Sequence, residues 1–348
     1  MSDTNYVRDP HSFRGRVEMR PFESELLKGN RPGDPHVREV PVYLPPAALE
    51  HPDRRFGVVF ILAGFTGRGH KYLDCDPWRP GVVPRYDRAV AAGEAEPAIL
   101  VLPDCFTSLG GSQYVNSSFL GPYEDHLVRE LVPWVDRLYP VRPGRRAVVG
   151  KSSGGFGALR LAMRHPELFP VAASISGDCW FEASLAADFP NCLRGLIPYG
   201  GDPAEFLEQF RREPELSGLG HSVINTLAMA AAYSPDPDSA LGFDLPFDLD
   251  TGARKQDVWR RWLEFDPLVC CESYAKNLRR LELLHLECGL MDEFHLQWGL
   301  RQLAAKLRAL NVAFDHEEHP GGHTGIEHRT LRLLPKLIAA LEPAHGQG

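Results

Sequence analysis

The chain has 348 residues and a formal net charge of −8, and 43% of its residues are hydrophobic. This composition is that of a globular protein with a sizeable core, so intrinsic disorder is excluded as the default. The acidic balance leaves no basic surface for a phosphate backbone, so we expect neither nucleic acid nor a membrane surface as a partner.

Residues 1–10 have neither the basic start nor the apolar core of a secretory signal. No apolar run in the sequence is long enough to cross a bilayer, and we therefore expect a cytoplasmic protein. The seven cysteines include no Cys-x-x-Cys pair, so they predict neither a disulfide framework nor a zinc cluster.

Eight apolar segments rich in β-branched residues predict the strands of a mostly parallel sheet flanked by helices. In chain order these segments are 16–22, 37–44, 57–62, 98–102, 147–149, 171–175, 283–286 and 312–316. The first two are expected to form an antiparallel edge. Amphipathic spacing predicts helices at 122–138, 156–164, 296–310 and 325–341. Thr324 and Glu327 are expected to form a capping box at the start of the last helix.

The segment 178–280 is a long insertion between two predicted strands, with helical pieces expected at 203–212, 225–233 and 256–264. A connection of this length in a compact domain usually carries function. We therefore predict a core of residues 1–177 and 281–348 and a cap of residues 178–280. The aromatic residues of the cap are candidates either for an apolar acyl pocket or for the core of the cap itself. They are Trp180, Phe181, Phe206, Phe210, Tyr233, Phe243, Phe247, Trp259 and Trp262.

The motif with the clearest chemical meaning is the G-x-S-x-G sequence at 150–154, directly after a short strand and before a helix rich in small residues. This is the setting of a nucleophile elbow, in which the serine occupies a strained turn and the flanking glycines avoid clashes. The bare pattern also arises by chance in glycine-rich turns, and its placement is what favours function. Ser152 is the expected nucleophile, because it is the central residue. Ser153 is expected to give its backbone N–H to an oxyanion hole.

A second donor to the oxyanion hole is expected from the glycine-rich turn at 63–69, which follows the strand 57–62. The backbone N–H of Phe65 is the candidate, since glycines on either side let the backbone approach a substrate oxygen closely. A plain glycine turn is the alternative interpretation.

A serine nucleophile also needs a carboxylate and a histidine, which follow it in that order in this type of site. Asp292 is the expected acid, because it follows a strand and a glycine turn. Asp178, after the preceding strand, is the main alternative, ahead of Glu287 and Glu293.

His323 is the expected base, because two glycines precede it in a loop between the last strand and the last helix. His316 and His319 are the alternatives. These three histidines do not form an H-E-x-x-H motif or its inverse, and they extend over a strand and a loop. We therefore predict no metal and no cofactor.

Several stretches carry a family resemblance. They are VYLPP at 42–46, LPD at 102–104, GGSQYVNS at 110–117, PYEDHLVRELVPWVDRLYPV at 122–141, the elbow segment 150–177, CGLMDEF at 288–294 and PGGHT at 320–324. With these motifs the chain resembles the esterase family of α/β-hydrolases that includes esterase D (S-formylglutathione hydrolase), feruloyl esterases, enterochelin esterases and mycolyltransferases. The resemblance implies the α/β-hydrolase fold. It also implies a triad of Ser152, Asp292 and His323, with Phe65 and Ser153 as oxyanion donors.

Two features depart from that family. Ala63 stands where many members carry His or Asp before the first glycine of the oxyanion turn, which puts the support of that turn in doubt. The insertion 178–280 is longer than in compact members, so substrate specificity does not carry over.

These observations predict a serine carboxylesterase that works through an acyl-enzyme intermediate. The alternatives are an acyltransferase with the same triad and a catalytically silent binding protein of the same fold. A small-molecule ester is the expected partner, and a homo-oligomer is left open. The sequence does not give the acyl or alcohol group of the substrate.

Overall fold

The computed structural model describes residues 13–342 apart from 77 and 79. The N-terminal segment judged above for a secretory signal therefore lies outside the described residues. Within them, no helix has both the length and the apolar character needed to cross a membrane.

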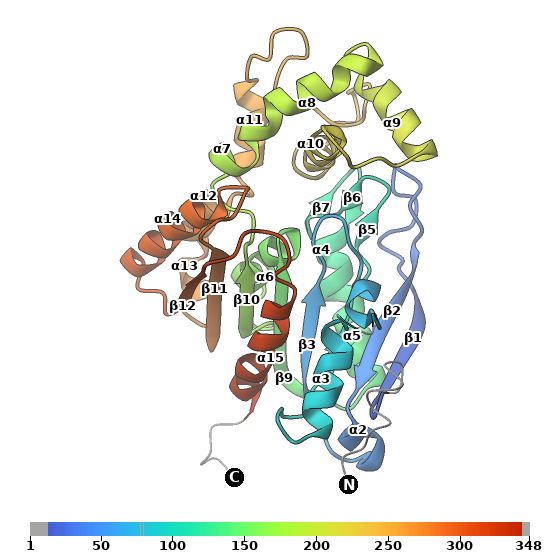
Figure 1. The fold of residues 1–348 in the computed structure, drawn as a ribbon, viewed down its shortest axis with the longest axis vertical. Helices are drawn as coiled ribbons and strands as arrows, with labels where there is room; N and C mark the ends of the chain where they lie inside the picture. Colours follow the sequence, from blue (N-terminus) through green and yellow to red (C-terminus); the bar gives the residue numbers. More distant parts are fainter. Residues whose placement is uncertain (1–12, 77, 79, 343–348) are drawn as a thin grey trace.

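The centre of the molecule is an eight-stranded sheet in the order β1-β2-β4-β3-β9-β10-β11-β12 (Figure 1). Its strands are β1 (Arg16–Glu23), β2 (Val37–Leu44), β3 (Phe56–Leu62), β4 (Ile99–Val101), β9 (Val141–Lys151), β10 (Val171–Ile175), β11 (Leu283–Gly289) and β12 (Asp315–His319). Strand β2 pairs antiparallel with β1 and β4, and all other neighbours are parallel. The prediction of a mostly parallel, eight-stranded sheet with an antiparallel edge is confirmed.

Both faces of the sheet are covered, which explains why its central strands are continuous apolar runs. All seven residues of β3 are buried. Because side chains alternate along a strand, Val58 and Phe60 belong to one core cluster while Val59 and Ile61 belong to the other.

The helices divide between these two faces. On one face lie α3 (Val82–Ala91) and α15 (His328–Leu341), seen in front of the sheet in Figure 1. On the other lie α5 (Val132–Leu138), α6 (Ser153–Arg164) and α14 (Leu296–Ala309). The predicted helix 122–138 is helical from its second residue onward. It begins with α4 (Tyr123–Asp125) and passes through a π-helical stretch, η2 (His126–Leu131), before α5.

Two predicted boundaries near the C-terminus are wrong. The last strand begins three residues later than expected, at Asp315, because this edge strand is polar and has no apolar pattern to mark it. The last helix begins at His328, and Glu327 is its N-cap residue without a side-chain hydrogen bond. Thr324 and Gly325, with φ +70 at the glycine, belong to the preceding loop, so no capping box forms.

The shorter elements connect this core. They are α2 (Pro46–Glu50), η1 (Gly69–Leu73), and two small hairpins, β5 (Phe106–Thr107) with β6 (Gly110–Gly111) and β7 (Asn116–Ser117) with β8 (Gly121–Pro122).

The insertion 178–280 forms a layer of helices over the carboxyl ends of the strands (Figure 1). Its elements are α7 (Phe181–Ser184), η3 (Ala186–Asp188), α8 (Phe189–Leu196), η4 (Ile197–Tyr199), α9 (Pro203–Arg212), α10 (Gly220–Tyr233), α11 (Gln256–Leu263), α12 (Pro267–Cys270), η5 (Cys271–Tyr274) and α13 (Ala275–Leu278). All three helical pieces expected there are present. Because α12 and α13 pack against α6 and α14, the end of the insertion lies on the core. The division of the chain into core and cap stays a prediction.

Candidate active site

Ser152 lies in the turn between β9 and α6, with φ +59 and ψ −128. This is a backbone conformation that residues other than glycine rarely adopt, and such strain is concentrated at functional sites. Both flanking glycines are required, because neighbouring backbone lies too close for a side chain. A Cβ on Gly150 would lie 2.3 Å from the backbone of Gly154, and a Cβ on Gly154 would lie 2.3 Å from the carbonyl oxygen of Leu62. Ser152 therefore lies in a tight turn that leaves no room for a side chain at either flanking glycine.

Three of the predicted residues meet in a chain of hydrogen bonds. The Nε2 atom of His323 lies 3.0 Å from the Oγ atom of Ser152, and its Nδ1 atom lies 2.9 Å from the Oδ2 atom of Asp292. Burial raises the pKa of the Asp292 carboxyl, but the hydrogen bond and positive charge of His323 and the backbone N–H of Phe294 bring it below its ordinary value. The carboxylate is therefore ionised and holds the imidazole with its Nε2 atom toward the serine.

The structure separates the alternative acids from this position. Glu293 accepts the backbone N–H of His323 at 2.6 Å, so it fastens the loop that carries the histidine. Glu287 is buried and pairs with Arg329. Asp178 lines the same cavity as Ser152 and His323 without a hydrogen bond to the imidazole.

The alternative histidines lie on β12, apart from the nucleophile. The Nδ1 atom of His319 accepts the backbone N–H of Gly321, and its Nε2 atom lies 3.8 Å from a carboxylate oxygen of Glu287. His316 lies 3.6 Å from Glu318.

The two expected oxyanion donors lie on either side of the nucleophile. Ser153 is the first residue of α6, so its N–H is one of those that a helix leaves without an internal partner. The turn that carries Phe65 presses against the elbow, since a Cβ on Gly64 would lie 3.5 Å from the Cβ of Ser152. A hydrogen bond of 3.1 Å from the Gly67 N–H to the Gly64 carbonyl closes that turn.

The support of the oxyanion turn comes from residues to which the sequence assigned no role. The hydroxyl of Tyr114 donates to the carbonyl of Ala63 at 2.6 Å, and the N–H of Gly111 donates to the carbonyl of Phe65 at 2.8 Å. The side-chain amide of Gln113 donates to the hydroxyl of Ser153 at 2.8 Å. All three supporting residues lie in the GGSQYVNS stretch, which had entered only as part of the family resemblance.

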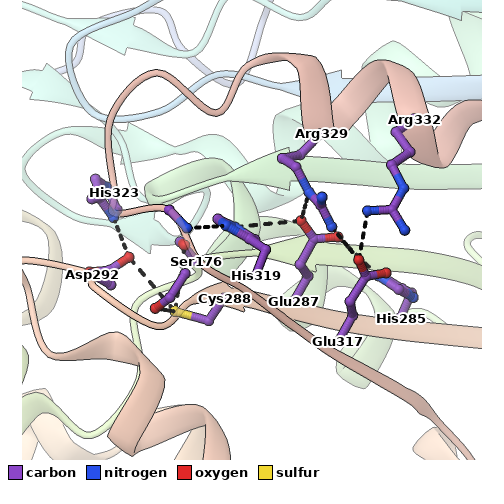
Figure 2. A network of polar contacts seen from close by, with 12 residues as sticks. Ser176, His285, Glu287, Cys288, Asp292, Glu317, His319, His323, Arg329 and Arg332 are labelled. Carbon is purple, nitrogen blue, oxygen red and sulfur yellow. Dashed lines mark hydrogen bonds and ion pairs between the residues drawn. The ribbon is translucent and has the colours of Figure 1, made fainter.

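Figure 2 shows a buried polar network behind His323 and Asp292. The thiol of Cys288 lies 3.7 Å from Oδ2 of Asp292 and 3.6 Å from the hydroxyl of Ser176. Burial, together with the charge of Asp292, raises the pKa of Cys288 to about 12. The thiol therefore stays protonated and is able to donate to the carboxylate. Ser176 adopts φ +44, which is unusual for a serine.

The same network continues to α15 through ion pairs (Figure 2). Arg329 bridges Glu287 and Glu317, and Arg332 contacts Glu317 at 2.7 Å. His285, Glu287 and Glu317 bring three potential metal-ligand atoms within 4.8 Å of one another. This group does not suit a metal ion, because the guanidinium of Arg329 already occupies the space between the two carboxylates.

A cavity of about 250 Å³ opens over Ser152 between the sheet and the cap. Its lining includes Ser152, Ser153, Asp178, His323, the turn Gly64, Phe65 and Thr66, the cap residues Ser184, Leu185, His221 and Asn225, and Lys71, Tyr72, Lys151, Phe294, Thr324, Glu327 and Thr330. None of the nine cap aromatics proposed for an acyl pocket belongs to it, within the described part of the chain. All of them except Trp180 belong to the hydrophobic core instead, and Phe189 packs on Phe247 and Trp259 at 4.9 and 5.7 Å between ring centroids.

The chain was compared with known proteins. The model of a family described as "Putative esterase" matches residues 35–324. Esterase Rv1288 of Mycobacterium tuberculosis is 41% identical over 268 residues, which are 74% of this chain and 48% of that protein. The chain thus spans about half the length of the curated relatives it matches.

Solved structures show the same architecture. A ferulic acid esterase superposes with a TM-score of 0.60 at 18% identity, over 95% of this chain and 100% of its own. An S-formylglutathione hydrolase from Agrobacterium tumefaciens gives a TM-score of 0.55 at 16% identity, over 95% and 97% of the two chains. The α/β-hydrolase fold predicted from the sequence is therefore confirmed.

Proposed function

The chain belongs to the esterase family whose model matches residues 35–324, and we propose on this basis that it hydrolyses carboxylic esters with Ser152 as nucleophile. The observation that carries the proposal is the unbroken chain of hydrogen bonds from Ser152 through His323 to Asp292. A serine hydroxyl is a poor nucleophile on its own, and this arrangement is the one that activates it.

The proposed reaction uses these groups in turn. Ser152 attacks the ester carbonyl and passes its proton to Nε2 of His323, 3.0 Å away. The negative charge that develops on the carbonyl oxygen is stabilised by the N–H groups of Phe65 and Ser153. His323 then returns the proton to the leaving alcohol, which leaves an acyl group on Ser152. Water, activated by the same histidine, releases the acid, while Asp292 stabilises the imidazolium in both halves of the reaction.

The cavity also bears on the choice of ester. Long acyl chains need an extended apolar channel, whereas a cavity of about 250 Å³ that combines six ionisable side chains with a few apolar and aromatic ones suits a short ester. We therefore propose small, water-soluble esters as the first substrates to examine.

The test combines labelling and turnover. The purified protein is treated with a fluorophosphonate probe and assayed with p-nitrophenyl acetate, beside the variants Ser152→Ala and Ser153→Ala. We expect Ser152→Ala to lose both labelling and turnover. Ser153→Ala should keep the labelling, because its contribution comes from the backbone. A wild-type protein that neither labels nor turns over would refute the proposed hydrolase and favour the silent binding protein. Added alcohols that divert the acyl group from water would indicate the acyltransferase.

A further inference from the structure

One carboxyl group in the catalytic cavity has no assigned part in the hydrolysis. Asp178 follows β10 at the carboxyl end of the sheet, and it lines the cavity together with Ser152 and His323. Among the residues that the structure describes, no hydrogen bond or ion pair to its carboxylate is found. A carboxylate in a confined site without a partner is costly, so such a group is retained where a ligand supplies the missing partner.

The nearest backbone donors are already used by another acid. The N–H groups of Trp180 and Phe181 donate to Asp266 at 3.0 and 2.7 Å, and the N–H of Leu268 donates to it at 2.9 Å. The carboxylate of Asp266 thus has its hydrogen-bond partners inside the protein. Asp178, two residues before Trp180, faces the cavity instead.

The cap gives the cavity a second polar group without a hydrogen bond. Asn225, on α10 of the cap, lines the cavity, and within the described chain its side-chain amide has no hydrogen bond. His221, one turn earlier on the same helix, makes ring contacts with Phe65 and Phe294 at 5.9 and 6.2 Å, and these contacts hold that part of the helix over the site. Asp178 and Asn225 therefore present an acceptor and an amide to whatever enters beneath the cap.

The position of Asp178 relative to the triad indicates which half of the ester it meets. The oxyanion turn follows β3, on one side of the nucleophile strand β9, whereas Asp178 follows β10 on the other side. Among charged groups, His323 has the largest effect on Asp178, and its positive charge opposes the rise that burial causes in the pKa of this carboxyl. The leaving alcohol must lie next to His323, because it receives its proton from that residue.

We propose that Asp178, assisted by Asn225, is a specificity-determining residue that accepts a hydrogen bond from a hydroxyl on the alcohol half of the substrate. The preferred substrates are then short esters of diols or polyols, in which a second hydroxyl lies near the ester oxygen. This inference rests on the proposed ester hydrolysis and refines its substrate class.

The test uses pairs of esters that differ only in replacing a methyl by a hydroxyl group. 2-Hydroxyethyl acetate is compared with propyl acetate for the alcohol half, and methyl glycolate with methyl propanoate for the acyl half. Values of kcat/KM are measured by acid release for the wild type, Asp178→Ala, Asp178→Asn and a control, Asp257→Asn. The control removes an exposed carboxylate of α11 that lies outside the cavity.

We expect the wild type to prefer 2-hydroxyethyl acetate over propyl acetate. Asp178→Ala should reduce this preference roughly tenfold, which is the usual effect of losing one hydrogen bond to a charged group. Asp178→Asn keeps an acceptor oxygen, so its preference should lie between those of the wild type and Asp178→Ala. Asp257→Asn should keep the wild-type ratio.

Three results would overturn the inference while leaving the hydrolase intact. An unchanged ratio with unchanged kcat/KM for both acetates would show that Asp178 does not meet the hydroxyl. An equal loss with both acetates would show that it acts on all esters through the charge of His323. A loss confined to methyl glycolate would place the contact in the acyl half. Failure of the wild type to cleave any of the four esters would instead contradict the proposed function itself.

Discussion

The two walls of the catalytic cavity differ in how their polar groups are used. Behind the sheet wall, which His323 helps to line, Asp292 receives hydrogen bonds from His323 and from the Phe294 N–H and lies against the thiol of Cys288. On the cap wall, Asp178 and Asn225 have no such partners within the described residues. The pKa values follow the same division, since that of Asp292 is lowered, whereas burial raises that of Asp178 to about 6.

In the proposed function, one cavity serves two tasks. Groups that stabilise a transition state work best when they are already oriented, so their hydrogen bonds are completed inside the protein. Groups that recognise a substrate must leave a bond unmade until the substrate arrives. The predictions below test that division, beginning with the largest expected effect.

Exchange of the two acids for amides gives the sharpest contrast between the walls. Asp292→Asn should lower kcat/KM for every ester by about 10⁴-fold, because the amide no longer fixes the tautomer of His323. Asp178→Asn should change the turnover of a simple ester such as propyl acetate far less. Steady-state kinetics of both variants measures this contrast. Similar losses in both would mean that the cap wall takes part in the chemistry.

The ion-pair network behind the triad should carry stability more than rate. Arg329→Met leaves the buried Glu287 without its main charge partner, and we expect a loss of about 3–5 kcal/mol in the free energy of unfolding. Arg332→Met is the matched control, because this exposed arginine pairs with the more accessible Glu317, and it should cost no more than about 1 kcal/mol. Urea denaturation measures both. Equal losses of unfolding free energy in the two variants would show that burial of the ion pair does not determine its contribution to stability.

The two acids should also affect the pH dependence of stability in opposite directions. The folded pKa of Asp178 is raised to about 6. Between about pH 4 and 6 this carboxyl is therefore mostly protonated in the folded state but mostly ionised in the unfolded chain. Its contribution to stability is therefore present below pH 4 and lost as the pH rises through 6. Asp178→Asn should gain on the order of 1–3 kcal/mol relative to wild type across this window.

The lowered pKa of Asp292 has the opposite effect on the pH dependence of stability. This carboxylate stabilises the folded state above its unfolded pKa, near 4, and the contribution is lost as the pH falls through the lower folded value. Asp292→Asn should therefore lose stability relative to wild type near neutral pH and approach it in acid. Thermal melts of both variants from pH 3 to 8 measure the two trends, and parallel curves for them would contradict the division between the walls.

The sequence was sufficient for the parts of the site that local patterns determine. The glycines around Ser152 are forced by the close approach of neighbouring backbone, so the elbow is visible in five consecutive residues. Asp292 and His323 each follow a strand end, and the carboxyl ends of parallel strands meet at one edge of a sheet. The strands themselves were visible because both faces of the sheet are apolar.

Contacts between distant parts of the chain were not predictable in this way. Tyr114 reaches Ala63 across 51 positions, and Ser176 reaches Cys288 across 112. No spacing rule encodes such pairs. The polar edge strand β12 was misplaced because ion pairs, rather than apolar burial, hold it to α15. The cap aromatics were ambiguous, since aromatic residues serve equally well in a pocket wall and in a core.

The smallest predicted effect concerns the support of the oxyanion turn. Tyr114 is buried and burial keeps its pKa well above the ordinary value, so its hydroxyl remains a donor to the Ala63 carbonyl. Tyr114→Phe removes only that hydrogen bond and should cost about 1 kcal/mol of stability. Because the bond holds the turn that carries Phe65, kcat should fall by roughly three- to tenfold while KM changes little, since the oxyanion is present only in the transition state.

Tyr72→Phe provides the comparison for this change. Its hydroxyl donates to the adjacent carbonyl, that of Leu62, at 3.0 Å, but Leu62 belongs to strand β3, which the sheet already holds. We expect a similar loss of stability with a smaller loss of kcat. If the two variants lower kcat equally, the turn does not depend on Tyr114. The sheet alone would then be sufficient to hold the oxyanion donors. The hydrogen bonds at Ala63 and Phe65 would not be needed to orient them.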